Sequence, residues 1–234
     1  MCGRFVSPET AEIERAWQLQ RRSANVFPRR FNVAPTMPLQ VIRAARDSTA
    51  WELAEARWGF IPGWWKQPKP PGNAFNARAE EAAAKPMWRD AYARMRCLIP
   101  VVGWYEWRAA ERADPGTGEI KAYRQPHYIR RADGKLACFA GLLSWRKEEG
   151  KEGFLTCALI TREAAPSVAD VHHRMPVVLQ DTDLSRWVDR SLVDPSAVAA
   201  LLEGAQSGFV HHPVTPRLNA AKTDEADFIE PVTL

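Results

Sequence analysis

The alternation of hydrophobic and polar positions along the chain predicts mostly short strands with a few helices between them. Strands punctuated by Pro and Gly are expected at residues 39–43, 52–60, 97–102, 104–108, 127–130, 136–143 and 154–161. The helical segments do not alternate with the strands in a βαβ rhythm. We therefore expect an α+β fold with a mainly antiparallel, barrel-like β-sheet and peripheral helices.

Helical spacing of apolar residues appears first over residues 8–20, where Ser7 is the expected N-cap and Pro8 suits the first turn. Residues 80–95 also have helical spacing, with a break expected at Pro86. The first of these segments is therefore predicted as one helix, and the second as a broken one.

Two late helices are expected at residues 181–189 and 194–203, each opened by an aspartate cap and the second with Pro195 just inside. No intervening loop is long enough to require a domain boundary. We expect a single domain over residues 1–234.

Composition narrows the class of protein. The chain has 234 residues, of which 46% are hydrophobic and 26% charged, as in an ordinary globular protein. No stretch approaches the roughly 20 apolar residues of a membrane helix, and the charged start of the chain does not look like a signal peptide, so a cytoplasmic location is expected. The four cysteines form no CxxC pair, so we expect free thiols, no metal and no cofactor.

Charge is distributed unevenly along the chain. Residues 1–150 hold 25 Lys and Arg against 16 Asp and Glu, whereas residues 151–234 hold 7 against 12. The chain also contains 10 Trp, several of them in close clusters such as Trp64 and Trp65. Aromatic rings beside basic residues suit single-stranded nucleic acid, because bases stack on the rings and cations meet the phosphates. The alternative is that the tryptophans belong to the core.

Cys2 follows the initiator methionine directly. If Met1 is removed, an α-amine and a thiol lie on neighbouring carbons, and their ordinary pKa values of about 8 and 8.5 would leave reactive fractions of both near neutral pH. Such a group can form an imine with an aldehyde and then close through sulfur to a thiazolidine. Alternatively, the thiolate could attack an amide, or the position of Cys2 could be incidental.

Two further segments carry candidate polar groups. Glu106 lies in an aromatic strand; facing inward, it would have a raised pKa suited to proton transfer, and facing outward it would be solvated. Asn76 and Arg78 share a face if their segment is extended, but Asn76 could equally cap a helix.

Two histidine doublets occur late in the chain. In an extended segment His172 and His173 would point in opposite directions, which makes a joint metal site improbable and leaves proton transfer by one imidazole open. The doublet of His211 and His212 has no acidic neighbour in the sequence and is interpreted as structural.

Several short motifs occur in order along the chain. They are MCGRF at the start, RFNVAP (30–35), WGF (58–60) with PGWW (62–65), NARAE (76–80), GWYEW (103–107), Thr161 and HHRMP (172–176). Taken together, these motifs resemble those of the SOS response-associated peptidase family, the abasic-site processing proteins, and their order and spacing match over essentially the whole chain.

The resemblance implies a monomer that removes Met1 by itself and traps abasic sites in single-stranded DNA as a thiazolidine crosslink, with a weak lyase activity possible. It further implies that the protein associates with the nucleoid when bound to DNA. The implied roles are Cys2 as nucleophile, Asn76 as the residue that holds the site and the sugar, Glu106 as proton shuttle and His172 as assistant in imine chemistry. The implied DNA contacts are Arg4, Trp64, Trp65, Arg78, Thr161 and Arg174.

Two other functions are compatible with parts of the sequence. Glutamine amidotransferases also begin Met-Cys-Gly, but the Asn-Gly-Glu and Arg-Pro-Leu motifs expected of their glutamine pocket do not occur here. A non-covalent single-strand binder would need only the tryptophans and the basic residues.

Overall fold

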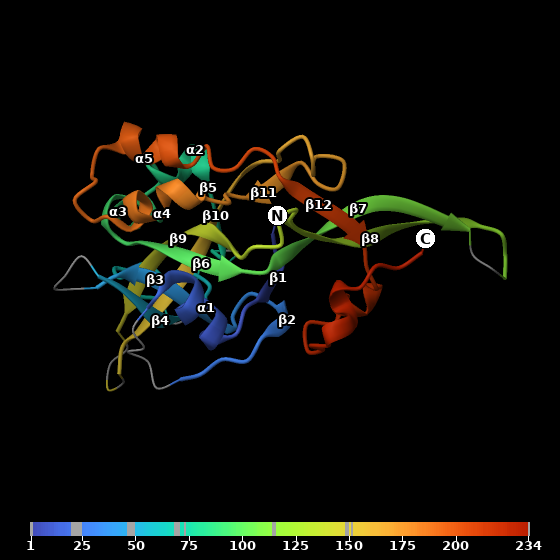
Figure 1. Ribbon diagram of the computed structural model, residues 1–234, viewed down its shortest axis with the longest axis horizontal. Coiled ribbons are helices and arrows are strands. Elements are labelled where there is room, and N and C mark those ends of the chain that lie inside the picture. The colour runs from blue at the N-terminus through green and yellow to red at the C-terminus, as the bar shows by residue number, and fades with distance from the viewer. Residues whose placement is uncertain are drawn as a thin grey trace.

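The computed structural model describes residues 2–19, 25–45, 50–67, 71–72, 74–113, 116–147, 150 and 152–233. Strands of two sheets form most of the molecule, and the helices lie around them (Figure 1).

Five strands within the described part of the chain form a closed barrel. In order around the ring they are β10 (Phe154–Glu163), β4 (Trp51–Trp58), β3 (Pro38–Ala44), β6 (Arg96–Val101) and β9 (Ala137–Arg146), and β9 pairs with β10 to close it. Two short strands, β5 (Asn76–Arg78) and β11 (Arg174–Pro176), also pair with β10. Only the pairings of β10 with β4 and β5 are parallel among those described. The predicted α+β fold with a mainly antiparallel barrel is confirmed.

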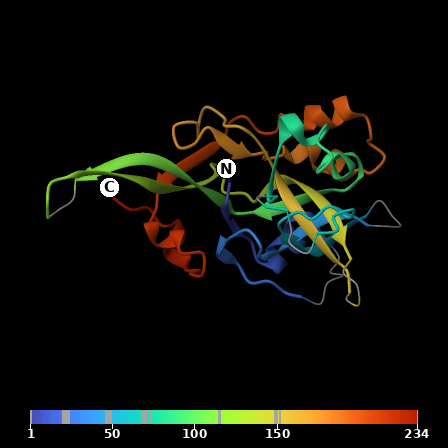
Figure 2. The same cartoon turned by 180° about the vertical axis from the view of Figure 1, so that it is seen from behind.

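The second sheet has the order β12 (Phe209–Pro213), β8 (Ile120–Arg131), β7 (Gly103–Ala113), β1 (Arg4–Ser7) and β2 (Arg30–Val33). Strands β7 and β8 form a long hairpin that projects from the body of the molecule (Figures 1 and 2). The two sheets meet where the chain leaves β6 and enters β7. A side chain at Gly103 would come within 2.5 Å of the Ile129 carbonyl oxygen, so this close approach requires glycine.

Aromatic residues fill the space between the two sheets. The ring of Phe5 in β1 lies 5.1 Å from that of Trp58 in β4 and 6.2 Å from that of Phe139 in β9. Trp104 of β7 contacts Phe139 at 5.7 Å. All four side chains are buried, so the prediction of an aromatic core holds for Trp58 and Trp104, and this core fixes β1 and β7 against the barrel.

The helices are short. They are α1 (Thr10–Trp17), α2 (Ala79–Ala82), α3 (Arg89–Arg94), α4 (Leu184–Val188), α5 (Pro195–Leu201) and the 3-10 turns Asp181–Asp183, Pro216–Asn219 and Ala226–Ile229. Helices α2 to α5 gather at the end of the molecule opposite the β7–β8 hairpin (Figure 1). No helix in the described ranges has the length and apolar character needed to cross a membrane.

All seven predicted strands are present, and β7, β8, β9 and β10 extend beyond their predicted ends. Alternation did not predict β1, β2, β5, β11 and β12, which have three to five residues each. Such short strands depend on partners that are distant in the sequence, so the local pattern carries little of their signal.

Helix ends differ more from the predictions. Helix α1 begins after Glu9, whose backbone N–H donates to Glu12, so the expected Ser7 cap is wrong. The left-handed conformation of Gln18 (φ 51°) ends α1, and residue 20 lies outside the described residues. The Pro86 break is confirmed, because α2 and α3 lie on either side of it.

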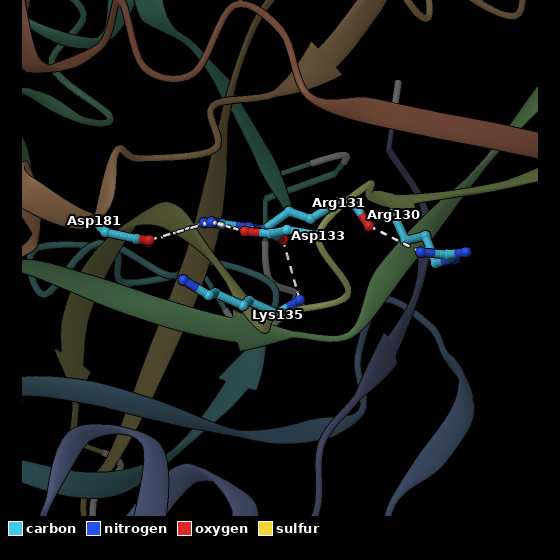
Figure 3. Close-up of polar contacts among 5 residues, drawn as sticks. All are labelled: Arg130, Arg131, Asp133, Lys135 and Asp181. Atoms are coloured by element: carbon cyan, nitrogen blue, oxygen red, sulfur yellow. Dashed lines mark hydrogen bonds and ion pairs between the residues drawn. The ribbon is translucent and has the colours of Figure 1, made fainter.

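The two late helices show opposite outcomes for their predicted caps. The Asp194 side chain caps α5 by accepting from the Ala197 N–H at 2.8 Å, as predicted. The expected Asp181 cap is wrong, since Gln180 precedes the first turn. The carboxylate of Asp181 instead accepts from Arg131 of β8 at 2.9 Å, and Arg131 also binds Asp133 at 2.7 Å (Figure 3).

One buried cation connects the helices to the barrel. The guanidinium of Arg96 in β6 is almost fully buried and lies at the C-terminal ends of α3 and α4. It donates five hydrogen bonds of 2.6 to 2.9 Å to the backbone carbonyls of Tyr92, Ala93, Trp187, Asp189 and Leu192. A cation at helix C-termini also interacts favourably with the helix dipoles.

We expect Arg96→Met to lower the free energy of unfolding by about 3 to 5 kcal/mol, because it leaves five carbonyls without their charged donor. Urea denaturation monitored by circular dichroism measures the change. Arg186→Ala, on the exposed side of α4, is the control and should change stability by less than about 0.5 kcal/mol. A loss below 1 kcal/mol for Arg96→Met would show that the helices are held mainly by apolar packing.

Candidate functional site

Strand ends from both sheets converge at the N-terminal end of the chain. β1 pairs with β7 through Arg4 and Tyr105, which brings the residues before Arg4 alongside Glu106. On the barrel side, β5 places Asn76 opposite Leu159 of β10. The side chain of Asn76 crosses between the sheets and donates from Nδ2 to the Cys2 carbonyl oxygen at 2.7 Å. Cys2, Asn76 and Glu106 are therefore brought together.

Asn76 belongs to a strand, so the alternative in which it caps a helix is wrong. The residue before it, Phe75, is fixed twice: its carbonyl accepts from the Trp58 indole N–H at 2.9 Å and from the Leu159 N–H at 3.0 Å. Helix α2 begins only after Arg78. Asn76 is thus held rigidly next to the Cys2 backbone.

Cys2 is fully buried in an environment that disfavours the thiolate. Burial raises the pKa of its thiol well above the usual range, and the nearby Glu106 carboxylate raises it further. Its Sγ lies 3.8 Å from the Arg4 carbonyl oxygen. In this environment the sulfur is held as a neutral thiol. The expected reactive fraction of thiolate concerns the chain after removal of Met1 and stays a prediction.

Glu106 faces inward, which settles the orientation that its sequence context left open. Its side chain is 2% exposed, and burial raises its pKa from 4.5 to about 7. A carboxyl group with this pKa can accept and donate protons near neutral pH. Glu106 therefore has the chemistry of a proton shuttle beside Cys2.

His172 lies next to Glu106, with 3.9 Å between its Nδ1 and the carboxylate Oε2. Its Nδ1 accepts from the Arg174 backbone N–H at 3.0 Å. Burial lowers the pKa of the imidazole, so the neutral form predominates at neutral pH. The expectation that the two histidines point in opposite directions is wrong: the rings of His172 and His173 stack, 4.4 Å apart, because the segment turns before β11 begins.

The residues expected to contact DNA differ in exposure. Arg78 is exposed at the end of β5. Arg174 is largely buried: it donates to both Glu80 oxygens at 2.6 and 3.1 Å and to the Thr161 carbonyl at 2.7 Å. This bidentate bond holds the pKa of Glu80 below its usual range. Thr161 itself is fully buried.

Arg4, Trp64 and Trp65 complete the predicted set. Arg4 lies next to Cys2 in sequence and is partly buried, and its Nη1 donates to the Gly3 carbonyl at 2.8 Å. The Trp64 side chain is 50% exposed, and its ring lies 5.9 Å from that of the half-buried Trp65. Trp64 therefore presents an aromatic face to solvent.

A chain of polar groups next to the site was not predicted from the sequence. Asp170 contacts Arg108 at 3.3 Å and His211 at 3.2 Å, and His211 contacts His127 at 3.2 Å between their Nδ1 atoms. His127 is the cross-strand partner of Glu106, and burial lowers its pKa to about 4. The register of the β7–β8 hairpin is the signal that would have revealed this pairing.

The sequence is similar to those of named proteins over almost its whole length. The chain is 31% identical over 234 residues to the abasic site processing protein YoqW of Bacillus subtilis, covering 98% of this chain and 99% of that protein. It is 32% identical over 241 residues to the abasic site processing protein YedK of Escherichia coli, covering 99% and 100%.

Solved structures agree with the fold. A protein from Bacteroides thetaiotaomicron superposes with a TM-score of 0.79 at 20% identity, over 98% of this chain and all of that one. A Bordetella bronchiseptica protein gives a TM-score of 0.73 at 25% identity, over 92% and 100%. The family model described as SOS response associated peptidase (SRAP) matches residues 1–221. The chain therefore belongs to the SRAP family.

Proposed function

We propose that this protein recognises abasic sites in single-stranded DNA and binds them covalently through Cys2 after Met1 has been removed. The relatives named as abasic site processing proteins support the substrate. The observation that carries the proposal is the placement of Cys2, held by Asn76 through its carbonyl, next to a buried carboxyl group with a pKa of about 7. Met1 lies outside the described residues.

The raised pKa of the Cys2 thiol indicates the order of the steps. The α-amine attacks the aldehyde of the ring-opened deoxyribose first, because the buried thiol is a poor nucleophile at neutral pH. The amine nitrogen bonds to the aldehyde carbon and gives a carbinolamine. Glu106 in its acid form protonates the hydroxyl group and water leaves. The Glu106 carboxylate then takes the proton from nitrogen, and an imine remains.

Sulfur closes the ring in the second stage. The Cys2 sulfur bonds to the imine carbon, the C=N electron pair moves to nitrogen, and the thiol proton reaches that nitrogen through the Glu106 carboxylate. The product is a thiazolidine, and no oxidant or reductant is required. Closure is intramolecular, which gives it a high effective concentration. If the imine persists, β-elimination at the sugar gives weak lyase activity.

The remaining residues have positioning and binding roles in this proposal. Asn76 fixes the Cys2 backbone, and His172 lies within 4 Å of Glu106, where it assists imine formation or its reversal. Arg78 is exposed and binds a phosphate, whereas Arg174 must exchange its Glu80 partner to do so. Arg4 lies beside Cys2, and the buried Thr161 holds Arg174 in place by accepting its hydrogen bond. Trp64 and Trp65 offer apolar surface to neighbouring bases.

The same site favours self-processing. In this part of the proposal, Glu106 in its base form takes the Cys2 thiol proton and the sulfur attacks the Met1 carbonyl carbon. The Met1–Cys2 peptide bond breaks as the proton passes to the departing α-amine, and water then hydrolyses the thioester, which releases Met1 and restores the thiol. The protein is in this sense a cysteine peptidase acting on its own first residue.

Incubation of the protein with three oligonucleotides tests the proposed function. One carries an abasic aldehyde, one carries the same site reduced by borohydride to an alcohol, and one is intact. We expect a band that resists boiling in detergent with the aldehyde alone. Equal non-covalent binding of all three without a band, or hydrolysis of glutamine without a band, would contradict the proposal.

A further inference from the structure

The β7–β8 hairpin has a basic cavity at the side where the C-terminal segment packs against it. The cavity has a volume of about 600 Å³. Its lining includes three cationic side chains, Arg112, Lys121 and Arg124, together with the Tyr123 ring and, among the described residues, no acidic side chain. The cavity is therefore suited to an anionic ligand.

Two contacts involve the cationic side chains of the cavity. The Arg112 guanidinium lies 5.8 Å from the centre of the Tyr123 ring, which orients it without neutralising it. Lys121 contacts Glu119 at 3.7 Å, but both side chains are more than half exposed, so this pair is weak and screened by salt. Arg112 and Lys121 are cross-strand partners, which places two cations side by side.

The cavity is connected to the reactive site along β7. Alternation puts Glu106, Arg108 and Arg112 on the same face of this strand. Arg108 lies between the two ends and contacts Asp170, two residues before His172. From Glu106 to Arg112 the strand spans about 20 Å, at about 3.4 Å per residue.

The length of this span sets how far a DNA strand must continue beyond the lesion to reach the cavity. One DNA strand in a duplex carries a phosphate about every 3.4 Å along the axis, so 20 Å corresponds to at most about six nucleotides, and to fewer along an extended single strand. A strand whose abasic sugar lies at Cys2 could therefore reach the hairpin only if it continues for several nucleotides beyond the lesion.

We propose that the basic cavity binds the phosphate backbone of the lesion-bearing DNA through Arg112 and Lys121, within about six nucleotides of the abasic site. This inference rests on the proposed function, because it takes the position of the lesion at Cys2 as its starting point. It adds a second contact, which makes affinity depend on the length of the DNA on one side of the lesion.

Binding of oligonucleotides with a stable abasic analogue, a tetrahydrofuran, tests the inference. A core oligonucleotide has one nucleotide on each side of the analogue, and two longer ones add ten nucleotides on the 5′ side or on the 3′ side. Fluorescence anisotropy at several salt concentrations gives Kd for the wild type, for Arg112→Ala/Lys121→Ala, and for the control Arg89→Ala/Arg186→Ala. The control arginines are exposed on α3 and α4, far from the hairpin.

We expect one of the two extensions to strengthen wild-type binding about tenfold at low salt, with a slope of log K against log[salt] steeper by about 0.7 per phosphate engaged. The hairpin variant loses this gain and binds the core oligonucleotide like the wild type, whereas the control keeps the gain. The inference is overturned if neither extension matters, or if the hairpin variant keeps the full gain. Because the analogue has no aldehyde, this result is independent of whether the covalent reaction occurs.

Discussion

Cys2→Ala should abolish the covalent product with abasic DNA while leaving the fold intact. The substitution removes the sulfur that closes the thiazolidine, so only a reversible imine with the α-amine can form. Because Cys2 is fully buried, alanine leaves a small cavity, for which a loss of about 1 to 2 kcal/mol of stability is expected. Denaturing gel electrophoresis after reaction with abasic single-stranded DNA measures the product, and circular dichroism measures the fold.

Cys2→Ser is the matched control, since it keeps the size of the side chain. Both Cys2 variants are prepared without Met1, because they lack the thiol that is proposed to release it, so the α-amine at position 2 is free in each. It should give a band only when borohydride is added to reduce the imine. A stable band from Cys2→Ala without borohydride would show that another residue forms the bond and would contradict the assignment of the nucleophile.

Glu106→Gln should slow formation of the covalent product by about a hundredfold or more at pH 7, because general acid–base catalysis contributes at least this factor. In the wild type the initial rate should bend near pH 7, where Glu106 changes between its acid and its base form. The glutamine side chain cannot titrate, so the variant should lose this bend. Initial rates between pH 5.5 and pH 9 measure both effects.

Glu106→Gln slows the reaction but should stabilise the folded protein relative to the wild type as the pH rises. The pKa of Glu106 is about 7 in the folded protein, against 4.5 without burial. Between these values the folded protein binds more protons than the unfolded chain, so wild-type stability falls as the pH rises through this window and levels off above pH 7. The free energy of unfolding of Glu106→Gln, relative to that of the wild type, should therefore rise by about 3 kcal/mol between pH 4 and pH 8. A constant difference in unfolding free energy across this range would show that Glu106 is not a buried acid.

The fold was predictable where a pattern extends over enough residues. Strands β3 and β10 have seven and ten residues and are buried over most of their length, so each appears in the sequence as a long, mainly apolar run. The three-residue strands β5 and β11 do not. They exist because β10 offers its edge to both, and this pairing is not encoded locally.

The candidate site was also predictable only in part. The chemistry of Cys2 and Glu106 could be inferred from residue type and position, but their pKa values could not. The inward orientation of Glu106 and the burial of the Cys2 thiol follow from how β1 and β7 pack on the barrel. The ion pair of Arg174 with Glu80 joins residues 94 positions apart, and no spacing rule connects them.

Peptide mass spectrometry of the wild-type product formed with an abasic oligonucleotide tests the central claim most directly. We expect the DNA-derived mass on a peptide that begins at Cys2 and lacks Met1, with the Cys2 thiol no longer open to alkylation. A crosslinked chain that still carries Met1, or a modified lysine with a free Cys2 thiol, would contradict the account.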